Sequence, residues 1–68
     1  MEAFAKRLKE LRTEKKISQA DLAQEIGASN SIVCYWETDH SEPTAPYIVK
    51  LADYFNVTAD YLLGRSDF

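Results

Sequence analysis

Hydrophobic residues recur at intervals of three and four along most of the chain, as they do in helices that bury one face. The pattern predicts five helices and no β-strand. The first helix covers residues 3 to 15, where Phe4, Leu8 and Leu11 form the apolar stripe. We therefore expect an all-α fold and a single domain spanning residues 1–68.

Two short amphipathic segments meet at Gly27, a residue that suits the left-handed conformation past a helix end. The first segment begins after Ser18, with Asp21 three residues later to complete a capping box. The second begins after Ser29 and continues to about Glu37. This arrangement predicts a helix-turn-helix, which holds one helix across another and leaves one face of the second helix free.

A polar loop over residues 38–43 and two further helices follow. Thr44 occupies the position of a cap for the fourth helix, and Pro46 is tolerated in its first turn. Asn56 interrupts the pattern, Thr58 caps the fifth helix, and Gly64 ends it. The side chains that we expect to be buried in these two helices are Ile48, Leu51, Ala52, Phe55, Leu62 and Leu63.

The third helix has an inner and an outer face when its residues are placed about 100° apart. Val33 and Trp36 point toward the core, and Glu37 points inward or along the edge. The outward face carries Ser31, Tyr35 and Thr38, with Ile32 and Cys34 at its margins, and Asn30 projects at the exposed N-terminal turn. Amide, hydroxyl and methyl groups of this kind can contact base edges in the DNA major groove. A solvated surface is the alternative interpretation, but the two-helix frame favours DNA contact.

Candidates for phosphate contact gather around the start of the second helix. Gln19 occupies its first turn, where free backbone N–H groups and the helix dipole favour an anion. The other candidates are Lys15, Lys16, Ser18 and His40. Glu and Lys alternate at helical spacing in the first helix, so most of its lysines are better interpreted as a solvated face.

The composition restricts the function further. The formal net charge is −3, which disfavours a polyanion, but residues 1–16 hold six of the eight basic residues. Cys34 is the only cysteine and no apolar run approaches membrane-spanning length, so we expect a cytoplasmic protein with no membrane partner. One histidine and one cysteine provide neither a catalytic set nor a metal site. We therefore expect no enzyme, no cofactor and no small-molecule substrate.

Self-association is a further expectation. A chain of this size buries only about 60% of the surface that its unfolded form exposes, so a second copy would add stability. Tyr47, Tyr54 and Tyr61 recur at a spacing of seven, and with Phe68 they could form an exposed rim or a partner-facing stripe.

Three segments of the chain resemble the Xre/Cro family of helix-turn-helix regulators: RLKELRTEKKI, SQADLAQEIGASNSIVCYWE and LADYFNVTADYLLG. The resemblance implies a five-helix, lambda-repressor-like DNA-binding domain that binds double-stranded DNA at a palindromic operator as a homodimer, with its third helix in the major groove. It also implies a largely buried ion pair between Arg12 and Glu37. The DNA contacts that it implies are Gln19 to phosphate and to a base, Ser29 to the backbone, Asn30 and Ser31 to base edges, and Tyr35 one turn further on.

The chain departs from the family pattern in its charges. No Lys or Arg lies between Lys16 and Lys50, and Thr38 and Asp39 stand where glycine is usual in the family. The following loop, often basic, contains Glu42 here. We therefore expect low affinity for phosphate and a shallow dependence on salt. The favoured function is a transcriptional regulator, most simply a repressor; the alternatives are a protein-interaction module, such as an antirepressor or adaptor, or an antitoxin.

Overall fold

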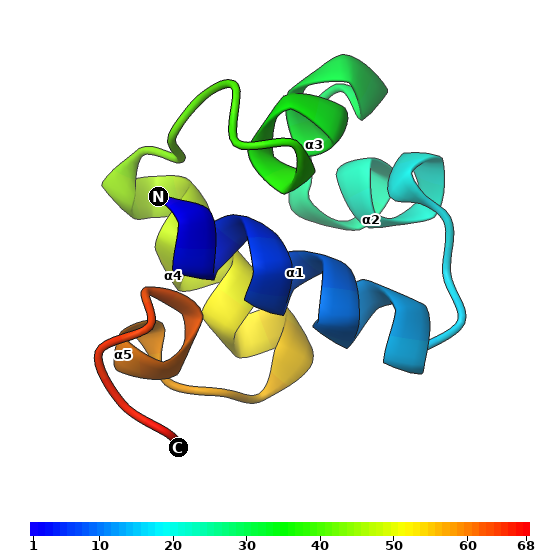
Figure 1. The fold of residues 1–68 in the computed structure, drawn as a ribbon. Coiled ribbons are helices and arrows are strands. Elements are labelled where there is room, and N and C mark those ends of the chain that lie inside the picture. Colours follow the sequence, from blue (N-terminus) through cyan, green and yellow to red (C-terminus); the bar gives the residue numbers. More distant parts are fainter.

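The computed structural model describes residues 1–68, and it contains five α-helices and no strand (Figure 1). The helices are α1 (Glu2–Glu14), α2 (Gln19–Ile26), α3 (Asn30–Glu37), α4 (Ala45–Phe55) and α5 (Ala59–Leu62). The prediction of an all-α fold with five helices is confirmed. Each helix lacks the length or the apolar character needed to cross a bilayer.

The helix α1 runs through the middle of the molecule (Figure 1). In this view α2 and α3 lie above α1, and α5 lies below it. The helix α3 packs mainly against α2 and α1, whereas α5 packs against α4 and α1. The two helices of the predicted helix-turn-helix therefore form one end of the molecule, and α1 and α4 hold that end to the rest.

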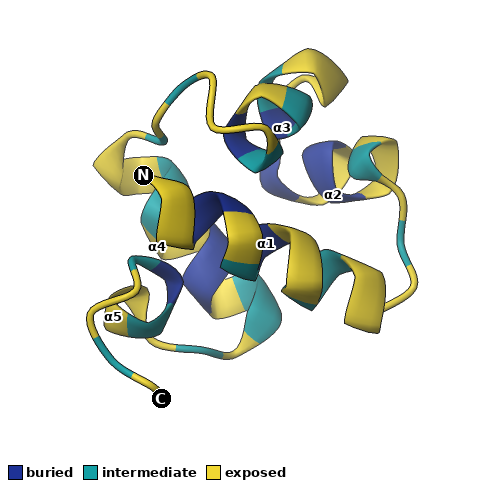
Figure 2. Cartoon of the chain, viewed as in Figure 1, coloured by how far each residue is buried: buried dark blue, intermediate teal, exposed yellow.

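A hydrophobic core takes side chains from all five helices (Figure 2). Its members are Phe4, Leu8, Leu22, Ala23, Ile26, Val33, Trp36, Leu51, Ala52 and Leu62. Four residues expected on buried faces are only partly buried: Leu11, Ile48, Phe55 and Leu63. Leu63 is the residue that follows the single turn of α5, so it does not share the inward direction of Leu62.

Most predicted helix ends are confirmed. The side chain of Ser29 accepts a hydrogen bond from the N–H of Ile32, and the side chain of Thr58 accepts one from the N–H of Tyr61. The helix α1 begins and ends one residue earlier than expected. The prediction for Thr44 is wrong in one respect, since it occupies the cap position of α4 but makes no side-chain cap hydrogen bond.

The missing cap at α4 has a local physical reason. A cap side chain accepts a hydrogen bond from the backbone N–H of the second or third residue of its helix. Pro46 is the second residue of α4, and proline has no N–H. One of the two donors available to Thr44 is therefore absent.

Two glycines adopt the left-handed conformation, Gly27 with φ 72° and Gly64 with φ 77°. A methyl group at Gly27 would meet no neighbouring atom, whereas one at Gly64 would collide with the Cβ atom of Ala3. We expect Gly27→Ala to lower the free energy of unfolding by about 1 kcal/mol, from backbone strain alone. Gly64→Ala adds the collision and should cost about 2–3 kcal/mol. Urea unfolding compares the two variants, and equal losses would contradict this explanation.

Candidate nucleic-acid interface

The turn between α2 and α3 is short and fixed by backbone hydrogen bonds. The N–H groups of Gly27 and Ala28 both bond to the carbonyl oxygen of Ala23. Gly27 provides the left-handed conformation that closes α2, as predicted. Val33 and Trp36 then bury the inner face of α3, with exposed fractions of 0% and 1%. The position of α3 across α2 is therefore set by the turn at one end and by core packing along its length.

A complete capping box opens α2. The hydroxyl of Ser18 accepts the N–H of Asp21 at 3.0 Å, and the carboxylate of Asp21 accepts the N–H of Ser18 at 3.1 Å. The hydrogen bond from the Ser18 backbone, together with the hydroxyl contact, holds the pKa of Asp21 below its ordinary value. The N–H groups of Gln19 and Ala20 have no partner within the chain, so the first turn of α2 presents two free donors.

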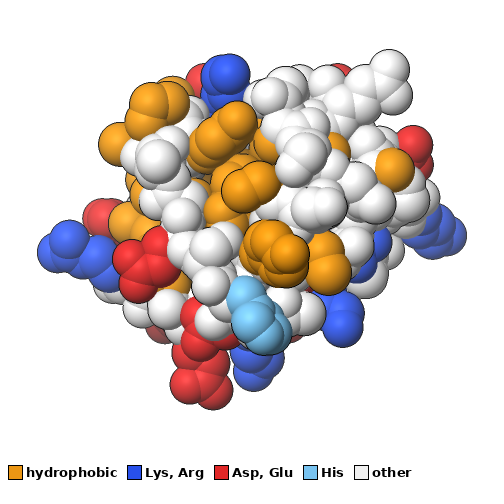
Figure 3. Space-filling view, turned by 90° about the horizontal axis from the view of Figure 1, so that it is seen from above, with side chains coloured by type: hydrophobic (Ala, Val, Ile, Leu, Met, Phe, Trp, Pro, Cys, Tyr) orange, Lys and Arg blue, Asp and Glu red, His pale blue; other side chains and the backbone are white.

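The outer face of α3 lies where the helical wheel predicts it. Asn30, Ser31 and Tyr35 are exposed, and Ile32 and Cys34 at the margins are partly buried. Tyr35 exposes 51% of its surface, so its ring extends well away from the core. Figure 3 looks down on the end of the molecule that carries α3: uncharged side chains occupy the middle of the view, and Lys and Arg lie around its edge.

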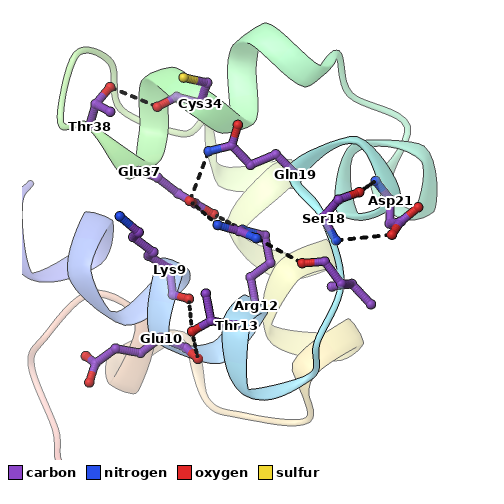
Figure 4. Close-up of polar contacts among 11 residues, drawn as sticks. Lys9, Glu10, Arg12, Thr13, Ser18, Gln19, Asp21, Cys34, Glu37 and Thr38 are labelled. Carbon is purple, nitrogen blue, oxygen red and sulfur yellow. Dashed lines mark hydrogen bonds and ion pairs between the residues drawn. The ribbon is translucent and has the colours of Figure 1, made fainter.

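The ion pair expected between α1 and α3 is present (Figure 4). The guanidinium of Arg12 donates to both oxygens of Glu37, at 2.6 Å and 3.0 Å. It also donates to the carbonyl oxygen of Ile17, at 2.9 Å, in the connection between α1 and α2. The Glu37 side chain is only 2% exposed, and its hydrogen bond to Arg12 raises the pKa of that guanidinium further. One partly buried arginine thus joins α1, the connection between α1 and α2, and α3.

The side chain of Gln19 takes part in the same network. Its Nε2 atom donates to Oε1 of Glu37 at 3.1 Å, and the residue is partly buried. The sequence predicts that Gln19 contacts phosphate and a base, but it gives no sign of this bond. The two residues are 18 positions apart, and no local pattern connects them.

The other expected phosphate contacts differ in their surroundings. The ammonium of Lys15 lies over the ring of Tyr54 on α4, 4.9 Å from its centre, whereas Lys16 is exposed at a left-handed position. Thr38 directs its hydroxyl back to the carbonyl oxygen of Cys34, at 2.8 Å.

His40 lies beside the C-terminal end of α3. Its Nδ1 atom is 2.8 Å from the hydroxyl of Thr38, and its ring is 6.3 Å from that of Tyr35. His40 and Tyr35 therefore lie together at one edge of the outer face of α3.

The profile of the helix-turn-helix family matches residues 8–62, which is most of the chain. The chain belongs to this family. Its expected likeness to the Xre/Cro regulators is confirmed by the relatives, which are transcriptional regulators and a phage repressor. This helix-turn-helix domain is a DNA-binding domain of the transcriptional-regulator type and not an enzyme.

Individual relatives resemble the domain over nearly all of its length. The HTH-type transcriptional regulator ImmR of Bacillus subtilis (strain 168) is 32% identical over 65 residues, covering 96% of this chain and 51% of ImmR. The chain thus spans about half the length of ImmR. The crystal structure of the c2 repressor of Salmonella phage P22 in complex with a synthetic operator superposes with a TM-score of 0.87. That match has 30% identity and covers 93% of this chain and 96% of the repressor chain.

The tyrosines of the helix-turn-helix domain do not form a common exposed stripe. Tyr47 packs edge-on against Trp36, with ring centres 5.1 Å apart, and Tyr54 packs against Phe55 at 5.0 Å. Tyr61 lies under the guanidinium of an α1 arginine and is partly buried. The three tyrosines therefore do not form an exposed rim, and the large aromatic that remains exposed beside these helices is Phe68, at 88%.

The arginine over Tyr61 is Arg7, which the sequence pattern places among the basic residues of a solvated helix face. Its guanidinium lies 4.3 Å from the centre of the Tyr61 ring and donates to the carbonyl oxygens of Tyr61 and Ser66. Arg7 therefore fastens α5 and the following segment to α1. The contact spans more than 50 positions, and no local signal could have indicated it.

Proposed function

We propose that this domain binds a palindromic operator in double-stranded DNA as a homodimer and acts as a repressor of transcription. The observation that carries the proposal is the division of α3 into a fully buried face and a polar, exposed face. A helix presented in this way fits the major groove, and two copies would place their α3 helices about 34–36 Å apart. The similar fold of the P22 c2 repressor, solved with a synthetic operator, supports the same mode of binding.

Within this proposal the residues have separate tasks. The free N–H groups of Gln19 and Ala20 would hold a phosphate at the positive end of the α2 dipole. Asn30, Ser31 and Tyr35 would contact base edges, because they project from the first two turns of α3. Ser29, Ile32, Cys34, Thr38, Lys16 and His40 would contribute contacts around them. Since α3 carries no cation, the affinity should depend only shallowly on salt.

Selection of bound sites from random duplexes tests the proposal, with Asn30→Ala as the decisive variant. An asparagine that pairs with adenine contributes about 1–3 kcal/mol of discrimination, so its removal should weaken binding and relax the preference at one base pair. The matched control is Gln24→Ala, which removes an exposed amide from the part of α2 that lies beside Lys50 and Asp53. Affinities for duplexes with one and two half-sites test the homodimer.

An interaction module is the second candidate, because Asp39 and Glu42 place negative charge beside α3. Both carboxylates lie near the N-terminal ammonium, at 2.9 Å and 3.9 Å, which offsets part of this charge. The selection experiment separates the two functions. If no duplex is preferred over random DNA at low salt, the regulator proposal fails, and an antirepressor, adaptor or antitoxin role takes its place.

A further inference from the structure

The carboxylate of Glu37 dictates which end of the Gln19 amide faces the protein. Ionised carboxylates only accept hydrogen bonds, whereas an amide has a donor end and an acceptor end. Glu37 is 2% exposed and already accepts two bonds from Arg12, so it is fixed in place. The NH2 group of Gln19 must therefore point toward Glu37, as it does at 3.1 Å.

The carbonyl oxygen of Gln19 consequently points away from Glu37. In Figure 4 this oxygen lies on the side of Cys34, at the margin of the outer face of α3. No group of the chain donates a hydrogen bond to it. The amide thus offers one free acceptor and its second N–H to a ligand bound against α3.

We propose that Gln19 recognises a base that presents an exocyclic amino group in the major groove, with adenine as the best fit, and that Glu37 is the positioning residue. This inference rests on the proposed binding of double-stranded DNA. Adenine presents an N6 donor and an N7 acceptor in the major groove, which match the free oxygen and N–H of Gln19. Guanine O6 and thymine O4 are acceptors and would oppose the carbonyl oxygen.

The same orientation favours a base over the phosphate that the sequence led us to expect for this side chain. A phosphate oxygen can accept the second N–H of Gln19 but leaves its outward carbonyl oxygen unpaired, whereas adenine pairs with both groups. The phosphate near α2 is left to the free backbone N–H groups of Gln19 and Ala20. Side chain and backbone of one residue thus have different DNA partners.

The test compares the DNA affinity of Gln19→Ala with that of the unmodified protein, on the selected duplex and on its single-base-pair variants. In the unmodified protein one position should prefer adenine by about 5- to 150-fold, the range of a bidentate amide contact. Gln19→Ala should abolish that preference and leave the other positions unchanged, and Gln24→Ala should alter none. If Gln19→Ala weakens binding equally for every duplex, the side chain contacts phosphate and the inference is overturned. An unchanged preference overturns it as well.

The positioning role of Glu37 has its own readout. In Glu37→Gln the new amide can offer either an oxygen or an NH2 group, so Gln19 is free to turn. The preference at its position should then broaden to guanine or thymine, while the circular dichroism spectrum stays that of the folded domain. A folded Glu37→Gln variant with an unchanged preference would refute the positioning role.

If Glu37→Gln fails to fold, nuclear magnetic resonance of the unmodified protein tests the orientation of the Gln19 amide instead. The side-chain amide protons of Gln19 should show contacts to the Arg12 guanidinium and one slowed exchange rate, because both groups share the Glu37 carboxylate. A freely turning amide would overturn the inference without any DNA. The two failures are distinguishable. If the Gln19 amide is fixed but the protein prefers no duplex, the proposed function and the base contact both fail, and only the orientation of the amide stands.

Discussion

Arg12→Ala should lower the free energy of unfolding by about 3–5 kcal/mol, because it leaves Glu37 buried without its charge partner. The pair is largely shielded from solvent, with side-chain exposed fractions of 13% for Arg12 and 2% for Glu37. Removal of the guanidinium also frees the carbonyl oxygen of Ile17. A small domain has little stability in reserve, so the variant should be largely unfolded at 37 °C.

Urea unfolding followed by circular dichroism measures this loss. Lys9→Ala is the matched control, since Lys9 is an exposed basic residue of the same helix without an ion pair and should change stability by no more than about 0.5 kcal/mol. The double substitution Arg12→Met with Glu37→Met should recover most of the loss, because a well-packed apolar pair often replaces a buried ion pair without cost. If Arg12→Ala were as stable as Lys9→Ala, the ion pair would not be needed for folding.

Trp36→Ala should cost about 3–5 kcal/mol, the usual loss for truncating a buried aromatic side chain. Trp36 is 1% exposed and contacts Phe4 of α1 and Tyr47 of α4 in edge-on geometry, with ring centres 6.3 Å and 5.1 Å away. Its removal would leave a cavity between three helices. Thermal and urea unfolding measure the effect.

The preceding residue provides the control. Tyr35 is 51% exposed and contacts only the His40 ring among the aromatic residues. Tyr35→Ala should therefore change the free energy of unfolding by less than about 1 kcal/mol while weakening DNA binding. If Tyr35→Ala destabilised the fold as much as Trp36→Ala, the assignment of inner and outer faces to α3 would be wrong.

Features that depend on nearby residues were accessible from the sequence. The capping box of Ser18 and Asp21 joins residues three apart, and so do the caps at Ser29 and Thr58. The wheel of α3 placed its buried and exposed faces correctly, because a short helix without proline or glycine has regular angles. At α4 the same local logic failed, since the proline two positions after Thr44 removes a donor.

Features that depend on distant residues were not accessible in the same way. The bond from Gln19 to Glu37 and the clamp of Arg7 on α5 arise only once the helices pack. A repeat of seven along the sequence indicates a shared face only within one unbroken helix. Asn56, in the left-handed conformation at φ 55°, separates α4 from α5 and places Tyr61 on a different axis from Tyr54.

The two faces of α3 bear on how such a domain can acquire a new target. Residues of the outer face have little role in the core, so mutation can vary them while the protein stays folded. Gln19 is more constrained than Asn30, because a change there also disturbs the bond to a carboxylate that the fold requires. Divergence, or deliberate retargeting, should therefore proceed through Asn30, Ser31 and Tyr35, with Gln19 changing last.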